Sequence, residues 1–142
     1  RTTGKKQTGA RQSDSNYQIE IFQKYIHTEQ KRWSDIYSVV RKNIPLTSDV
    51  YIWGSGIHTS QLFAFTSIQK EYHITALLDS NPKKWGKKLA DYLCCSVNDI
   101  HWKKNDTIII SSFASENEIY HSIKYLRDQG INVIRLYQRD TL

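Results

Sequence analysis

The feature of this sequence that most constrains its fold is a short apolar run that ends in two glycines one residue apart. Residues 50–53 are β-branched, aliphatic or aromatic, which is typical of a strand buried on both faces of a sheet. Gly54 and Gly56 follow at once, and from residue 57 the apolar positions take the three- and four-residue spacing of a helix. This change of period across one tight turn predicts a strand that passes directly into a helix.

Strands and helices alternate through the rest of the chain. Apolar runs predict four further strands, at residues 74–78, 93–96, 107–110 and 133–136. One helix is expected over residues 57–70. A second begins at Ser115, whose side chain forms a capping box with that of Glu118, and ends at Gly130. The alternation predicts an α/β fold: a three-layer, Rossmann-like, mainly parallel sheet of about five strands, preceded by an N-terminal helix.

The N-terminal part of the chain precedes this pattern. Residues 1–16 are rich in Thr, Gly, Lys and Gln and show no hydrophobic periodicity, so we expect a disordered tail or an expression remnant. Over residues 17–45, apolar side chains that include Trp33 recur at helical spacing until Pro45, which predicts an N-terminal helical segment. The Rossmann-like domain is then expected over residues 48–142.

Composition narrows the function classes. The formal net charge is +6, but residues 1–16 hold four basic side chains against one acidic, which is +3 of the total, so we expect no nucleic-acid partner. No stretch reaches the roughly 18 apolar residues of a membrane span, and we expect a soluble, cytoplasmic protein without a membrane partner. Cys94 and Cys95 are neighbours, which gives neither a disulfide framework nor a metal-ligand spacing. Because the chain starts at Arg1 rather than at a methionine, we expect missing sequence, such as a catalytic domain N-terminal to Arg1.

The glycine turn has the form of a phosphate-binding loop. In such a turn the first glycine permits the tight bend, and the second lets a pyrophosphate approach the backbone N–H groups. Gly54 and Gly56 fit these positions, and the positive end of the following helix dipole favours an anion there. Thr59 replaces the third glycine of the full pattern, and either holds the helix further from the strand or offers a hydroxyl to a ligand. A structural turn that binds nothing is the alternative.

Two side chains beside the turn are candidate ligand contacts. Asp79 lies 23 residues beyond Gly56 at the end of the second strand, near the spacing at which a carboxylate meets a ribose hydroxyl, although it also suits a turn cap. His58 lies in the first helical turn, where it either donates to a phosphate or is an exposed polar residue. The lysines that follow Asp79 could attract a phosphorylated ligand, but we interpret them as a solvated face; they are Lys83, Lys84, Lys87 and Lys88.

Two serines come from the opposite side of the predicted crevice. Ligands of open α/β sheets bind outside the carboxyl ends of the strands, which places Ser111 and Ser112 beside the glycine turn, unless they serve only the entry into the next helix. Tyr120 and Lys124 have the spacing of the short-chain dehydrogenase dyad, but they lie one helix too early, and we interpret Tyr120 as a packing residue. No catalytic residue and no metal ligand is predicted.

Three segments carry a resemblance to known domains: residues 52–59, 78–89 and 109–112. They resemble the small Rossmann-like domains of bacterial polysaccharide and nucleotide-sugar biosynthesis proteins, which include dehydratase- and epimerase-like modules and modules attached to methyltransferases or glycosyltransferases. The resemblance covers about residues 48–140 and implies a phosphate turn with a ribose contact. The predicted cofactor-binding residues are Gly54, Ser55, Gly56, Ile57, His58, Thr59, Asp79, Ser111 and Ser112.

These observations favour an accessory nucleotide-binding module of a larger carbohydrate or polysaccharide biosynthesis protein, with NAD(P) or a nucleotide sugar as its small-molecule ligand. One alternative is an NAD(P)-dependent nucleotide-sugar oxidoreductase or epimerase, completed by missing sequence or by the partner in a homodimer. Another is a ligand-free structural or interaction domain that uses the helix containing Trp33 as an adaptor.

Overall fold

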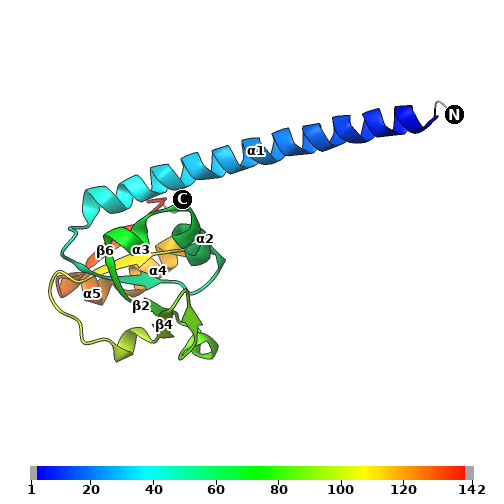
Figure 1. The fold of residues 1–142 in the computed structure, drawn as a ribbon. Coiled ribbons are helices and arrows are strands. Elements are labelled where there is room, and N and C mark those ends of the chain that lie inside the picture. The colour runs from blue at the N-terminus through cyan, green and yellow to red at the C-terminus, as the bar shows by residue number, and fades with distance from the viewer. Residues whose placement is uncertain (1–2, 140–142) are drawn as a thin grey trace. The chain divides into compact units, whose positions relative to one another are not determined.

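A computed structural model describes residues 3–139, with side chains from residue 13 onward. The chain divides into two compact units, Arg1–Arg32 and Trp33–Leu142. Helix α1 (Thr3–Asn43) contains the boundary, so its last turns belong to the second unit. All the strands and the other helices also belong to that unit (Figure 1).

The second unit is built on a six-stranded mixed sheet (Figure 1). The strand order is β3-β4-β2-β1-β5-β6, in which β3 runs antiparallel to β4 and all other neighbours are parallel. The strands are β1 (Asp49–Trp53), β2 (His73–Leu78), β3 (Lys88–Leu89), β4 (Tyr92–Cys95), β5 (Thr107–Ile110) and β6 (Asn132–Arg135). The chain goes from β1 to β2 and β4 on one side and then crosses to β5 and β6 on the other. The strand order therefore reverses between β1 and β5.

The register brings the ends of three strands to one edge of the sheet. Trp53, the last residue of β1, pairs with Leu78 of β2 and Ile110 of β5. The backbone ladder continues by one step, because the Gly54 N–H donates to the Leu78 carbonyl at 2.7 Å and the Ser111 N–H donates to the Trp53 carbonyl at 2.9 Å. The residues that follow the three strands therefore lie next to one another at this edge of the sheet.

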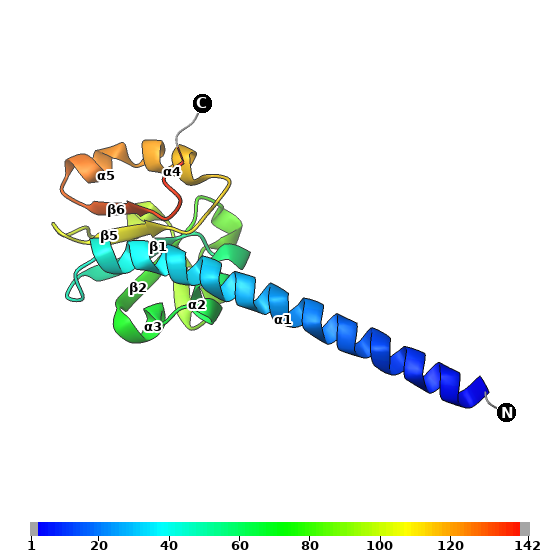
Figure 2. The same cartoon turned by 90° about the horizontal axis from the view of Figure 1, so that it is seen from above.

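Both faces of the sheet are covered by apolar side chains. These side chains come from helices packed on the sheet: the end of α1, α2 (Ile57–Phe65), α3 (Ile68–Glu71), α4 (Glu116–Ser122) and α5 (Lys124–Asp128). Ile52 belongs to a core cluster with Trp33 and Leu62, and its neighbour Trp53 belongs to a second cluster with Leu126. Figure 2 shows α4 and α5 on one side of the sheet and α2 and α3 on the other. Burial on both faces explains why the central strands are continuous apolar runs.

The predicted α/β class, N-terminal helix and mainly parallel sheet are confirmed. The sheet has six strands rather than about five, because the short edge strand β3 pairs with β4. The two predicted helices in the second unit are each divided. Thr66 ends α2 in an extended conformation, and its hydroxyl donates to the Leu62 carbonyl and accepts from the Ile68 N–H. Ile123, at φ −107° and ψ 24°, separates α4 from α5.

The N-terminal helix differs from the prediction in its extent. Residues 3–16, which we expected to be disordered, continue α1, whereas residues 1 and 2 lie outside the described residues. A formed helix lengthens without a new nucleation step, and lysine, arginine and glutamine lose little side-chain freedom in it, so a polar segment can extend a packed helix. The predicted apolar spacing is confirmed where α1 joins the second unit, because Trp33, Tyr37 and Val40 are buried.

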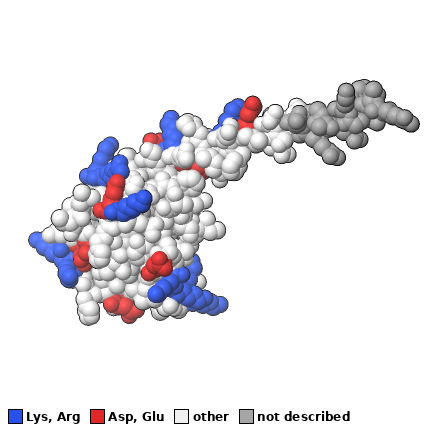
Figure 3. All heavy atoms as spheres, viewed as in Figure 1, with Lys and Arg blue, Asp and Glu red and all other residues white. Residues whose placement is uncertain are grey.

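The described surface carries charges of both signs. On the face shown in Figure 3, the Lys and Arg side chains alternate with Asp and Glu and form no continuous basic patch among the described residues. Within residues 3–139 there is no helix long and apolar enough to cross a membrane.

Candidate functional site

A cavity of about 670 Å³ lies where β1, β2 and β5 end. Its walls are the Gly54 turn with the first turn of α2, the residues that follow β2, and the loop from Ser111 into α4. Every residue of the predicted cofactor-binding set lines this cavity except Thr59. Its volume lies within the range of about 300–1,000 Å³ that is common for small-molecule sites.

Gly54 is required by the fold itself. Its φ is +127°, a region that residues with a side chain rarely adopt. A Cβ atom at this position would lie 2.8 Å from the carbonyl oxygen of Ser111. Only glycine therefore allows β1 and β5 to approach each other this closely at their ends.

Gly56 has a different environment. Its φ of −142° and ψ of −157° are ordinary extended values, and the nearest atom to an added Cβ is Nζ of Lys84 at 3.7 Å. Neither a positive φ nor a close contact requires glycine here, although Gly56 is also the N-cap residue of α2, a position that glycine suits. The space that a Cβ would fill opens into the cavity, which is the arrangement expected where a ligand must approach the backbone.

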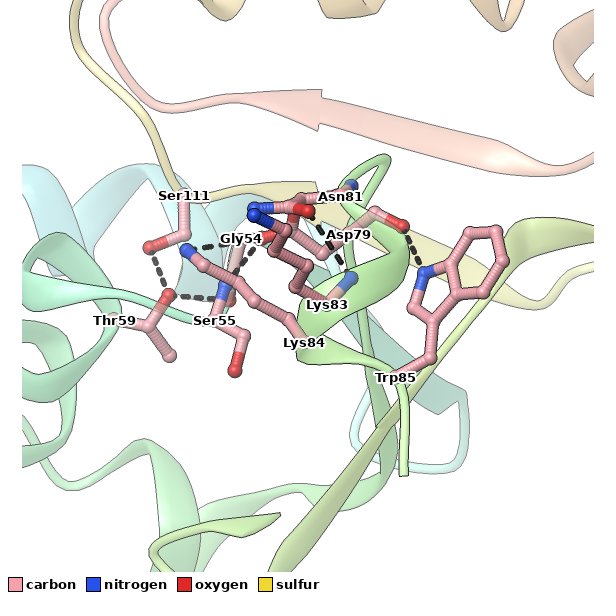
Figure 4. A network of polar contacts seen from close by, with 9 residues as sticks. All are labelled: Gly54, Ser55, Thr59, Asp79, Asn81, Lys83, Lys84, Trp85 and Ser111. Atoms are coloured by element: carbon pink, nitrogen blue, oxygen red, sulfur yellow. Dashed lines mark hydrogen bonds and ion pairs between the residues drawn. The ribbon is translucent and has the colours of Figure 1, made fainter. Parts of the chain in front are cut away.

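Thr59 holds the turn against β5. It is completely buried, its hydroxyl donates to the Gly54 carbonyl oxygen at 2.7 Å, and its Oγ1 lies 2.9 Å from Oγ of Ser111 (Figure 4). Both of these contacts lie inside the protein and Thr59 does not line the cavity, so a contact of its hydroxyl with a ligand stays a prediction. Thr59 replaces the third glycine by tying helix and strand together with hydrogen bonds.

His58 is held by both ring nitrogens. Nδ1 lies 2.6 Å from Oγ of Ser111, Nε2 lies 2.6 Å from the hydroxyl of Tyr137, and the ring centroid lies 5.0 Å from that of Trp33. The sequence analysis missed Tyr137; its only signal was that it follows β6 at the carboxyl edge of the sheet. His58 lines the cavity, but these contacts make it a connection between α2, β5 and the segment after β6.

Ser111, His58 and Tyr137 also have the order of a nucleophile, a base and an orienting group. Ser111 is only 4% exposed, however, and Thr59 already contacts its hydroxyl. The network therefore fixes the glycine turn and presents no exposed nucleophile to a substrate.

Asp79 forms three polar contacts around the turn (Figure 4). Its Oδ1 accepts from the Asn81 N–H at 2.9 Å, which is the turn cap expected as the alternative. Its Oδ2 accepts from the Ser55 N–H at 3.3 Å and lies 3.4 Å from Nζ of Lys84. Trp85 donates from its indole N–H to the Asp79 carbonyl at 2.7 Å and fixes the backbone here. A contact of Asp79 with ribose stays a prediction.

The opposite wall is formed by the loop that enters α4. The Ser112 hydroxyl oxygen accepts from the Ser115 N–H at 3.1 Å, so it closes the loop before the helix. The predicted capping box is wrong, because Ser115 is the N-cap residue but its side chain makes no capping hydrogen bond. Phe113, on the same wall, is half exposed and packs edge-on against Tyr137 with ring centroids 4.9 Å apart.

Two further groups bear on whether the site is catalytic. Burial raises the pKa of the Cys94 thiol, an effect that a hydrogen bond from the Ser55 side chain partly offsets, so this thiol stays protonated at neutral pH and is a poor nucleophile. Lys124 forms an ion pair with Asp128 at 2.9 Å. The guanidinium carbon of Arg127 lies over the ring of Tyr120, 3.7 Å from the ring centroid. Tyr120 and Lys124 therefore each have structural contacts of their own.

Fold and site together define a class of protein, an α/β domain whose mainly parallel sheet carries a ligand-sized cavity at the carboxyl ends of its strands. The family described as C2185-like, N-terminal, matches residues 46–133, which is more than half of the chain and includes all three walls of the cavity. The chain belongs to this C2185-like N-terminal domain family. No curated protein and no solved structure matches the chain.

Proposed function

We propose that this domain is a three-layer, Rossmann-like, nucleotide-binding module, accessory to a larger cytoplasmic protein of carbohydrate or polysaccharide biosynthesis. NAD(P) or a nucleotide sugar is the proposed ligand. The observation that carries the proposal is the open face of Gly56, which lines a cavity of ligand size and where neither a positive φ nor a close contact requires glycine.

The strand order supports this ligand class. In open α/β sheets, ligands bind outside the carboxyl ends of the strands at the point where the order reverses. Here that point lies between β1 and β5, and the cavity is located at it. The N-terminus of α2 adds backbone N–H groups and the positive end of a helix dipole.

The groups around the cavity suggest how a nucleotide would lie. A phosphate group at Gly56 would meet the backbone of the turn, and a ribose near Asp79 would be within reach of a carboxylate that retains acceptor capacity. Phe113 on the opposite wall is half exposed, but the Arg139 guanidinium lies over its ring, 3.6 Å from the ring centroid, so this ring already stacks within the protein. The hydroxyl groups of Ser111 and Tyr137 and the imidazole of His58 are hydrogen-bonded to one another. We therefore propose binding and no chemical step.

Calorimetric titration tests the proposal. NAD(H), NADP(H), UDP-sugars and coenzyme A are titrated into the chain and into a Gly56→Ala variant, whose backbone angles alanine tolerates. We expect at least one of these ligands to bind the parent chain and to bind G56A more weakly. Absence of binding by every ligand would refute the proposal.

A second candidate, self-association, is favoured by the first unit of the chain. Its segment of α1 exposes large apolar side chains, with exposed fractions of 66% for Tyr17, 50% for Ile19, 50% for Ile21, 63% for Phe22 and 57% for Tyr25. Trp33, in the helix predicted as an adaptor, is fully buried in the second unit, so the exposed apolar side chains of that helix lie N-terminal to it. An identical helix from a second copy would cover this apolar surface symmetrically.

Light scattering with size-exclusion chromatography tests this candidate. We expect a dimer that Phe22→Glu converts to a monomer, while Gln23→Glu, a change at the neighbouring polar position, leaves the dimer intact. A monomeric parent chain at all concentrations would exclude self-association.

A further inference from the structure

One lysine of the cluster after β2 lies at the cavity, although the sequence favoured a solvated face for all four. Lys83, Lys87 and Lys88 are exposed, whereas Lys84 is partly buried and is the member of the cluster that lines the cavity. That interpretation is confirmed for three of the lysines and wrong for Lys84.

The chain after β2 fixes the base of the Lys84 side chain. Residues Pro82–Lys84 form a single 3₁₀ turn, η1, and the Asn81 side chain caps it by accepting from the Lys83 N–H at 3.1 Å. The Lys84 N–H donates to the Asn81 carbonyl at 3.0 Å. From this turn the side chain reaches back over the glycine turn (Figure 4).

The ammonium group of Lys84 lies over the open face of the glycine turn. Its Nζ is 3.7 Å from the position of a Gly56 Cβ and 3.4 Å from Oδ2 of Asp79. The same Oδ2 accepts from the Ser55 N–H. A backbone N–H and an ammonium group therefore converge on one negatively charged oxygen, which is the pattern of donors that a phosphate oxygen requires.

The ion pair alone does not account for this arrangement. The Lys84 side chain is 41% exposed, and exposed ion pairs contribute little once the entropy of holding a long side chain is included. The lysine is nevertheless held above Gly56, the glycine of the turn that neither a positive φ nor a close contact requires. A ligand between Gly56 and Lys84 would explain both features.

We infer that Lys84 is the cation that binds the ligand's phosphate in this cavity, and that Asp79 contacts the same donors when no phosphate is bound. This inference deepens the proposed function and rests on it. Asp79 then opposes phosphate binding, because its carboxylate competes with the phosphate for Lys84 and for the Ser55 N–H. A ligand with a phosphate or pyrophosphate group is the class that this subsite selects.

Pyrophosphate is the probe that tests the inference, because it has no ribose and no base. It is titrated calorimetrically into the full chain and its variants at low ionic strength, beside ADP and adenosine. We expect Lys84→Gln to weaken pyrophosphate and ADP binding by about tenfold, because it removes one charge-assisted hydrogen bond, while adenosine binding is unchanged. Lys84→Arg should retain most of the affinity, and the matched control Lys83→Gln should change it by less than about twofold.

Asp79→Asn provides the opposite test. Removal of the competing negative charge should tighten pyrophosphate binding by about threefold, whereas a purely supporting role would weaken it. Circular dichroism of each variant verifies that it is folded.

The outcomes separate the two proposals. If the parent chain binds ADP and K84Q behaves like K83Q, the inference about Lys84 is refuted and nucleotide binding stands. If pyrophosphate binds through Lys84 but no nucleotide does, the phosphate subsite stands and the nucleotide module is refuted. Weaker pyrophosphate binding by D79N refutes the competing role of Asp79. If none of the probes binds, both proposals are refuted.

Discussion

Replacing Gly54 by alanine should destabilise the domain strongly, whereas the same change at Gly56 should not. At Gly54 the new side chain must adopt a φ of +127°, which costs roughly 1–3 kcal/mol for a residue other than glycine. Its Cβ would also lie 2.8 Å from a backbone oxygen of Ser111, and overpacking of this kind adds roughly another 1–3 kcal/mol. The expected loss for G54A is therefore about 2–6 kcal/mol, a large share of the roughly 5–15 kcal/mol that stabilises a typical domain.

At Gly56 neither cost arises. The extended backbone angles suit alanine, and the nearest atom is the mobile end of a lysine 3.7 Å away. We expect G56A to lower the free energy of unfolding by only about 0.5–1.5 kcal/mol, since alanine is a poorer N-cap residue than glycine. Its larger effect should appear in binding, where a methyl group in the path of a phosphate costs roughly 1–3 kcal/mol, or about fivefold to 150-fold in affinity.

Urea unfolding followed by circular dichroism measures the stability difference, and calorimetric titration measures binding to the same two variants. Equal stability of G54A and G56A would refute the argument that the first glycine serves the fold. Unchanged ligand affinity of G56A would refute the argument that the second serves the ligand.

Three further changes test the core and two polar contacts of the second unit. Trp33→Ala should lower the free energy of unfolding by about 3–5 kcal/mol in urea, because the ring is fully buried; a loss below about 1 kcal/mol would contradict its place in the core. Tyr137→Phe should cost about 0.5–1.5 kcal/mol in the same assay by removing the hydrogen bond to His58, and an unchanged midpoint would show that this contact contributes nothing. Hydrogen bonds from Arg41 and from Tyr37 lower the pKa of Glu71, so this carboxylate stabilises the fold above the unfolded-state pKa near 4.5 and loses that effect as the pH falls below it. Glu71→Gln should therefore weaken the acid dependence of stability, measured as urea midpoints from neutral pH downward, and an identical dependence in both proteins would contradict the assignment.

The elements that the sequence predicted well are those whose residues are buried on both faces. Residues 107–110 are β5, and all four side chains are fully or almost fully buried, so nearly every position had to be apolar. The same reasoning located β1 and the turn after it. The edge strand β3 was missed because two residues, one of them a lysine, form no pattern, and the pairing with β4 depends on tertiary structure.

The site was predicted in position but only partly in detail. Strand ends in a parallel sheet meet at one edge, so Gly54, Asp79 and Ser111 could be grouped from the sequence alone. The use of each side chain could not be predicted, because the hydrogen bonds of Thr59 link residues far apart in sequence. Which lysine of the cluster lies at the cavity could not be predicted for a related reason, since nothing in a run of lysines indicates which member turns back toward the sheet.

A nuclear magnetic resonance titration shows whether the glycine turn binds a nucleotide. Backbone amide signals of the full chain are recorded while NAD⁺, UDP-glucose or coenzyme A is added. We expect saturable shifts for at least one ligand, concentrated at residues 54–59 and at Asp79 and Ser111, with smaller shifts elsewhere. Signals that do not move with any ligand, or shifts confined to residues away from this cavity, would contradict it.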